Sequence, residues 1–157
     1  MTIKPFAALA ALAVASPLAA QSTAPDPTPD PTYVTPLNGS WAYAPAAGGS
    51  ESVFRDAAGR TQLTVQCSRA SRQVRISKPA SGAAPFMIVW TSSMTRSVPA
   101  SFDPATGNVS ATLTAYDALL DALALSRARI AVTLTGGPQL VLPNWAEVER
   151  VIEDCRA

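Results

Sequence analysis

Residues 61–67 read TQLTVQC, and their apolar members occupy every second position. Side chains alternate between the two faces of a β-strand, so Leu63, Val65 and Cys67 are predicted to share the buried face. The same alternation recurs in three further segments, residues 73–77, 108–114 and 127–135. Residues 86–90 are apolar throughout, which is typical of a strand covered on both faces.

Two segments show the periodicity of a helix instead. Residues 114–126 place three leucines on one side, with Thr114 as a candidate N-cap. Residues 144–156 carry an apolar stripe, and Asn144 with Glu147 forms a capping box at its start. We therefore expect an α+β fold, mainly an antiparallel β-sheet with two short helices packed on it.

The N-terminal part of the chain has the composition of an export signal followed by a spacer. Residues 1–20 carry a positive charge near the start, an apolar run, and small residues that end at Ala20, as in a secretory signal peptide. Residues 21–36, in which proline occupies every second position from 25 to 31, are predicted to be an extended linker. Residues 37–157 are left as a single α+β domain. No later segment approaches the length of about 18 apolar residues that a membrane span needs.

The alanine-rich, lysine-poor composition is typical of a GC-rich bacterium, so we expect a periplasmic protein. Cysteines of an exported protein usually pair. Cys67 lies on the inner face of its strand and Cys155 on the apolar stripe of the last helix. We predict a structural disulfide between them that closes a long loop and stabilises the domain. A redox-active dithiol is the less favoured alternative, because such cysteines usually lie close in sequence.

The charged residues are nearly balanced: lysine and arginine total 12, aspartate and glutamate total 11, and histidine is absent. This balance argues against a nucleic-acid partner, which needs a concentrated basic face. The absence of histidine excludes Ser-His-Asp and Cys-His relays, and two cysteines alone do not make a structural zinc site. We expect neither a metal nor a cofactor.

Some polar residues are nevertheless candidates for a binding site. The guanidinium groups that could bind a carboxylate or phosphate are those of Arg75, Arg96, Arg127 and Arg129. Arg127 and Arg129 are expected to project from the face of their strand opposite to its core residues. The alternative is a solvated strand face whose arginines pair with Asp117 or Asp121 of the preceding helix.

Several segments carry a resemblance to known proteins. Residues 116–129 (YDALLDALALSRAR), 140–147 (LVLPNWAE) and 153–156 (EDCR) resemble small exported proteins of unknown function from sphingomonads and related alphaproteobacteria. That resemblance implies no catalytic residues. The order of helix, basic strand, hairpin and closing helix with a late cysteine is distantly similar to the invasion-associated locus B family of periplasmic proteins. The general design, β-rich with one disulfide, is also similar to small periplasmic metalloprotease inhibitors.

These features predict a non-enzymatic periplasmic protein that binds an envelope component or another protein, as a monomer or weak dimer. Two alternatives from other classes remain. Asp117 and Asp121 are neighbours on the predicted helix and could divide acid and base roles in a hydrolase. The protein could instead inhibit an exported protease, with the linker or an exposed loop as bait.

Overall fold

The computed structural model describes residues 28–157, which form two antiparallel sheets and two α-helices. The predicted class, mainly antiparallel strands with two helices and one disulfide, is confirmed. The strands in chain order are β1 (Gly39–Ala46), β2 (Gly49–Asp56), β3 (Thr61–Ser68), β4 (Gln73–Pro79), β5 (Phe86–Trp90), β6 (Thr95–Pro99), β7 (Ser101–Asp103), β8 (Asn108–Thr114), β9 (Arg129–Leu134) and β10 (Gln139–Pro143). The helices are a 3-10 turn η1 (Pro31–Tyr33), α1 (Ala118–Ala124) and α2 (Ala146–Arg156).

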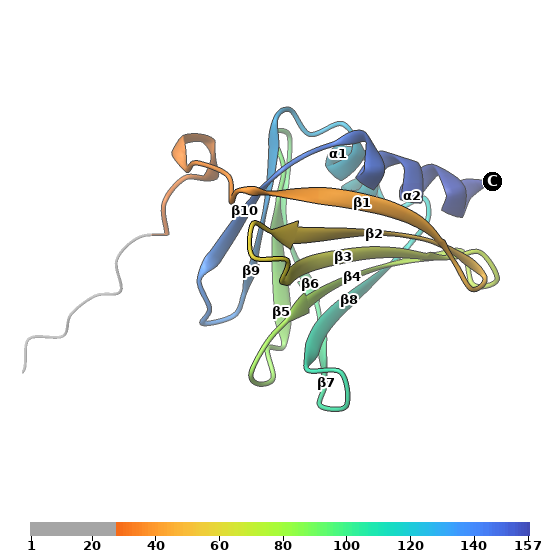
Figure 1. Cartoon of the computed structure of the whole chain (residues 1–157), viewed down its shortest axis with the longest axis horizontal. Helices are drawn as coiled ribbons and strands as arrows, with labels where there is room; N and C mark the ends of the chain where they lie inside the picture. Colours follow the sequence, from red (N-terminus) through yellow and green to blue (C-terminus); the bar gives the residue numbers. More distant parts are fainter. Residues whose placement is uncertain (1–27) are drawn as a thin grey trace, which may run out of the picture.

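The larger sheet has the strand order β1-β2-β3-β4-β8-β7, and the smaller sheet has the order β10-β9-β5-β6. The chain therefore leaves the larger sheet after β4, builds β5 and β6 of the smaller sheet, and returns to pair β8 with β4. Figure 1 shows the strands of the smaller sheet running across those of the larger one. Helix α2 packs against β1, β2 and β3, and α1 packs against α2.

The core confirms the alternation predicted for residues 61–67. Leu63, Val65 and Cys67 are each at most 2% exposed and belong to the buried apolar cluster. The residues between them, Thr64 and Gln66, are only half-buried and lie on the opposite face of the larger sheet. The larger sheet therefore has one apolar face toward α2 and one polar face away from it.

The predicted start of the first helix was wrong. Thr114 ends β8, and α1 begins after Asp117, whose Oδ1 accepts a hydrogen bond from the main-chain N–H of Leu119 at 2.8 Å. Register in the larger sheet explains the difference: Thr114 is paired with Gln73 of β4 and so remains in the strand. Asp117 is therefore the N-cap of α1, the role that the sequence suggested for Thr114.

The capping box predicted for the second helix is also absent. Helix α2 has Trp145 at its N-cap position, and no side chain caps its first turn. The Nδ2 of Asn144 instead donates to the carbonyl oxygens of Leu123 and Ser126, at 3.0 and 2.9 Å. These carbonyls lie at and beyond the end of α1, where helical partners are missing, and they orient the amide toward α1. Oδ1 of Asn144, the atom that would accept a capping hydrogen bond, is buried without a partner among residues 28–157.

The strand predicted at residues 127–135 begins two residues later than expected, as β9. Ala128 has a φ of 64°, in the left-handed region, which interrupts the extended conformation before Arg129. Arg127 therefore lies in the preceding turn and does not share a strand face with Arg129. Strands β6 and β7 were not predicted from the sequence, which shows a run of small and hydroxyl residues there.

The signal peptide predicted at residues 1–20 lies outside the described residues, as do residues 21–27 of the predicted linker. In the part of the chain that the structure describes, no helix is long and apolar enough to cross a membrane.

Candidate functional site

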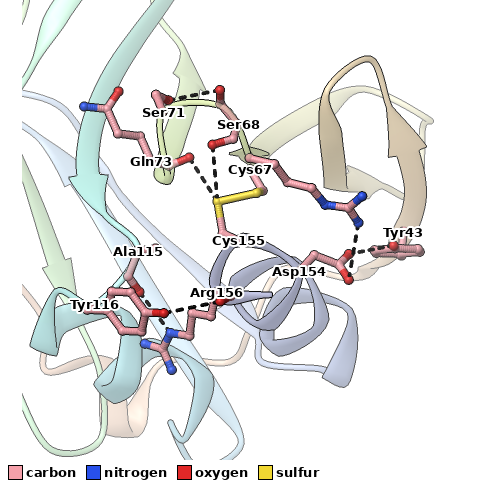
Figure 2. Close-up of a disulfide and its surroundings, with 11 residues drawn as sticks. Tyr43, Cys67, Ser68, Ser71, Gln73, Ala115, Tyr116, Asp154, Cys155 and Arg156 are labelled. Atoms are coloured by element: carbon pink, nitrogen blue, oxygen red, sulfur yellow. Dashed lines mark hydrogen bonds and ion pairs between the residues drawn. A yellow bond between two sulfur atoms is a disulfide. The ribbon is translucent and has the colours of Figure 1, made fainter.

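The predicted disulfide between Cys67 and Cys155 is confirmed and joins β3 to α2 (Figure 2). The two Cα atoms lie 5.4 Å apart, and the side chains are 2% and 1% exposed. A bond buried this deeply has no accessible sulfur for thiol exchange, which favours the structural role over the redox alternative.

The polar residues around the disulfide hold α2 in place. The hydroxyl of Tyr43 donates to Oδ2 of Asp154 at 2.7 Å, and the guanidinium of Arg150 lies 4.0 Å from the centre of the Tyr43 ring. This hydrogen bond, together with the nearby positive charges of Arg69 and Arg150, lowers the pKa of Asp154. Figure 2 shows Asp154 directed at Tyr43 from the helix.

The carboxylates proposed for a hydrolase are each bound to a different arginine. Oδ1 of Asp117 lies 2.7 Å from Arg96, and Oδ1 of Asp121 lies 2.7 Å from Arg156. Asp117 is also used as the cap of α1. These two ion pairs bind the carboxylates separately, so the structure does not present them together as an acid and base pair. Across residues 28–157, no group of three or more acidic or cysteine side chains could hold a metal ion.

Three of the four arginine candidates do not form a common anion site. Arg96 pairs with Asp117, which is the ion-pair alternative that the sequence left open. Nη1 of Arg129 donates to the carbonyl oxygens of Thr32 and Val34 at 2.8 and 2.7 Å, and so holds the end of the linker. Arg127 is exposed in its turn. All three belong to the smaller sheet or the turn before it, whereas Arg75 lies on the larger sheet.

Arg75 lies at the middle of the polar face of the larger sheet. Its neighbours across the adjacent strands are Gln66 on β3 and Thr112 on β8, both uncharged. Its side chain is exposed, and none of the ion pairs within residues 28–157 involves it. An arginine in this position has its full set of donors available to a ligand.

The surface around Arg75 is hollowed. We use the name polar groove for the outward-facing residues of three neighbouring strands, Thr64, Gln66, Arg75, Ser77, Ser110 and Thr112. Two adjoining hollows of about 390 and 120 Å³ share Gln66, Arg75 and Thr112 in their walls. The larger hollow reaches β7 and the turn after it, and every residue that lines either hollow is polar.

The rows of side chains across the strands explain how the polar groove forms. Thr64 faces Ser77, and Ser77 in turn faces Ser110, whose Oγ lies 2.8 Å from the Oγ of Ser77. Short hydroxyl side chains in one row leave space that the longer Gln66 and Arg75 border in the next. The shape of the polar groove therefore follows from side-chain length along paired strands.

Sequence reasoning missed the polar groove, although it selected Arg75. The signal was present: the outward positions of the segments 61–67, 73–77 and 108–114 carry hydroxyl, amide or guanidinium groups. The missing information was that β8 pairs with β4, although more than 30 residues separate most paired positions, such as Ser77 and Ser110. Only that pairing gives the groove its second wall.

A separate hollow of about 380 Å³ lies between the loops of residues 79–84 and 134–138. Lys78 is the one charged side chain that lines it, and burial lowers the pKa of its amine. The rest of the lining consists of small, apolar and hydroxyl residues of the two loops, so this hollow offers few directed polar groups to a ligand.

Comparison of the chain with protein-family models, with curated proteins and with solved structures found no match.

Proposed function

We propose that this chain is an exported, non-enzymatic binding protein of the bacterial envelope, and that its ligand binds in the polar groove. The observation that carries the proposal is the exposed Arg75, which has uncharged neighbours on both sides within a hollowed face lined by polar side chains. Opposite charges on neighbouring strands stabilise a sheet, and Arg75 has no such partner on either neighbouring strand.

Two further features support export and a rigid scaffold. The disulfide is of the kind that persists in oxidising compartments, and it joins the sheet that carries the polar groove to the last helix. The N-terminal segment has the composition of a signal peptide and a proline-rich spacer. A domain held in this way presents a preformed surface, which lowers the entropy cost of binding.

The hydrolase alternative has less support, because Asp117 and Asp121 are each paired with their own arginine. For the inhibitor alternative, no exposed loop stands out as a bait in the described part of the chain. Neither alternative assigns a role to the polar groove, on which the binding proposal rests.

The experiment is a binding comparison with matched variants. Purified protein from the periplasmic fraction is immobilised and exposed to fragments of the envelope, and the retained material is identified by mass spectrometry. The Arg75→Gln variant should bind the material that wild type retains at least about tenfold more weakly, which corresponds to 1.4 kcal/mol. Arg55→Gln is the control, because Arg55 is exposed on β2 of the same sheet and does not line either hollow.

Equal retention by wild type and Arg75→Gln would overturn the proposal. Cytoplasmic location of the full-length chain in fractionated cells would overturn the export part of it. Turnover of an envelope fragment that Asp117→Asn abolishes would favour the hydrolase instead.

A further inference from the structure

We infer that the polar groove binds an acidic glycan, with one sugar carboxylate paired to Arg75 and the sugar hydroxyls bound by the surrounding side chains. The inference rests on the proposed function and names the ligand class of the same site. The unpaired charge of Arg75, the polar side chains that line the polar groove, and the size of this face of the larger sheet support it.

Two acidic residues, Glu51 and Asp103, lie on the same face of the larger sheet as Arg75. In its row across the sheet, Gln66 separates it from Glu51 of β2, so two strand spacings of about 5 Å each lie between them. Asp103 lies farther along the polar groove, opposite Asn108, and its carboxylate accepts hydrogen bonds from Ala105 and Thr106 of its own turn. The charge of Arg75 is therefore left for an external anion.

A site with a single guanidinium favours a ligand with isolated carboxylates over a polyanion. Among residues 28–157, Arg75 is the one cation that lines the two hollows, and Asp103 is the one anion. A nucleic acid or a polyphosphate would need several cations side by side to displace its counterions. One planar carboxylate matches the two-pronged donor set of one arginine.

The rest of the lining suits a polyhydroxylated ligand. Hydroxyl groups such as those of Ser77, Ser110 and Thr112 both donate and accept, and the amide of Gln66 does so with two separate atoms. A sugar hydroxyl also both donates and accepts. Each sugar hydroxyl can therefore pair with a side chain of the polar groove, and no polar group is left unpaired on binding. No apolar side chain lines either hollow, which disfavours a lipid chain or the apolar side chains of a peptide.

The dimensions fit a short stretch of saccharide. The larger hollow of about 390 Å³ is within the range of small-molecule sites, and the face crosses the four strands β3, β4, β8 and β7, about 14 Å in all. The site is shallow and has no aromatic ring for a sugar to stack on. We therefore expect weak binding that depends strongly on salt, because a solvent-accessible, bidentate arginine–carboxylate pair supplies its selectivity.

The test uses tetragalacturonic acid as the probe and its carboxyl-reduced, neutral form as the matched control ligand. Binding to ¹⁵N-labelled wild-type protein is followed by NMR titration at low and at high salt. We expect the acid form to shift amide signals of β3, β4 and β8, and to bind at least about tenfold more tightly than the neutral form. High salt should remove most of that difference.

Three variants connect the binding to the polar groove. Arg75→Gln should reduce acid binding by about tenfold or more, and Arg55→Gln should leave it unchanged. Thr112→Val removes one hydroxyl at nearly constant volume and should reduce binding several-fold. It also serves as a second test if Arg75→Gln does not fold.

The possible failures can be told apart. Equal affinity for the acid and neutral probes, or shifts confined to residues outside β3, β4 and β8, overturns the acidic-glycan inference. If the glycan test fails but Arg75→Gln still retains less envelope material than wild type, the proposed function stands and only the glycan inference is overturned. If Arg75→Gln retains as much envelope material as wild type does, both are overturned. Displacement of the probe by an equimolar amount of inorganic phosphate would also overturn the inference, because it would show a general anion site.

Discussion

Arg129 illustrates how one side chain decides the position of a segment far away in sequence. Its Nη1 donates to the carbonyl oxygens of Pro31, Thr32 and Val34, at 3.2, 2.8 and 2.7 Å. Pro31 is buried, although it belongs to a segment predicted to be an extended linker. The end of that linker is thus fastened to β9 of the smaller sheet.

Arg129→Ala should therefore release the N-terminal segment and destabilise the protein by about 1–2 kcal/mol, because charge-assisted hydrogen bonds to partly exposed carbonyls are lost. Limited proteolysis with mass spectrometry should show faster cleavage between residues 28 and 36. Arg127→Ala is the control, since Arg127 is exposed in the turn before β9. Equal cleavage rates in the two variants would contradict the role of Arg129.

Asp154 gives the stability of the fold a pH dependence. The hydrogen bond from Tyr43 and the charges of Arg69 and Arg150 lower its pKa from the ordinary value of 3.8. A carboxylate with a lowered pKa in the folded state stabilises the protein above its unfolded pKa, and this contribution is lost as the pH falls through the folded pKa.

Asp154→Asn should accordingly be less stable than wild type at neutral pH, and the difference should shrink as the pH falls below about 4. Urea unfolding followed by circular dichroism from neutral pH to about pH 3 measures it. Glu149→Gln, on the exposed side of the same helix, should show no such trend. A difference for Asp154→Asn that stays constant over the whole range would refute this assignment.

At the scale of secondary-structure elements, the disulfide joins β3 to α2 across a sequence separation of 88 residues. A cross-link stabilises a protein mainly by restricting the unfolded chain, and the effect grows with the length of the closed loop. The same bond holds α2 against β2 and β3 near the C-terminus of the chain.

Replacing both cysteines by alanine, with Cys67→Ala and Cys155→Ala together, should lower the free energy of unfolding by about 4–5 kcal/mol. Guanidinium unfolding of the variant, compared with wild type, measures the change. Wild type treated with a reductant in denaturant should approach the stability of the variant. If the unfolding midpoints of variant and oxidised wild type coincide, the disulfide does not contribute as we propose.

At the scale of the whole molecule, the two sheets and α2 share one core. The buried cluster includes Phe54 of the larger sheet, Met87 and Val132 of the smaller sheet, and Ile152 of α2, each fully buried. Because these side chains fill one continuous interior, a cavity opened in α2 should destabilise both sheets together.

Ile152→Ala should therefore lower the free energy of unfolding by about 2–5 kcal/mol. Both sheets should still unfold in a single transition, at a lower midpoint than in wild type. Hydrogen exchange measured by mass spectrometry should show faster exchange in β3 and in β9 alike. Glu149→Ala on the exposed side of α2 should change stability by no more than about 0.5 kcal/mol. Faster exchange limited to α2 and the larger sheet would show that the sheets unfold separately.

Residues that are neighbours in sequence allowed the most reliable predictions. The alternation at residues 61–67 identified the buried positions of β3, and the leucine face identified α1. The helix starts were predicted wrongly, because Thr114 was already held in a strand and the amide of Asn144 was taken by carbonyls near the end of α1. In both places a tertiary contact outweighed a local capping preference.

Which side chains face the core could be predicted from the residues alone, because that depends on a period of two or of 3.6 residues within one element. The partner of each cysteine could also be predicted, because there are only two. The three-dimensional fold was needed to show that β8 lies beside β4, that Arg129 holds the end of the linker, and that Arg75 lies within the polar groove. Those outcomes depend on pairing between segments that the chain separates by tens of residues, and such pairing leaves no local pattern to read.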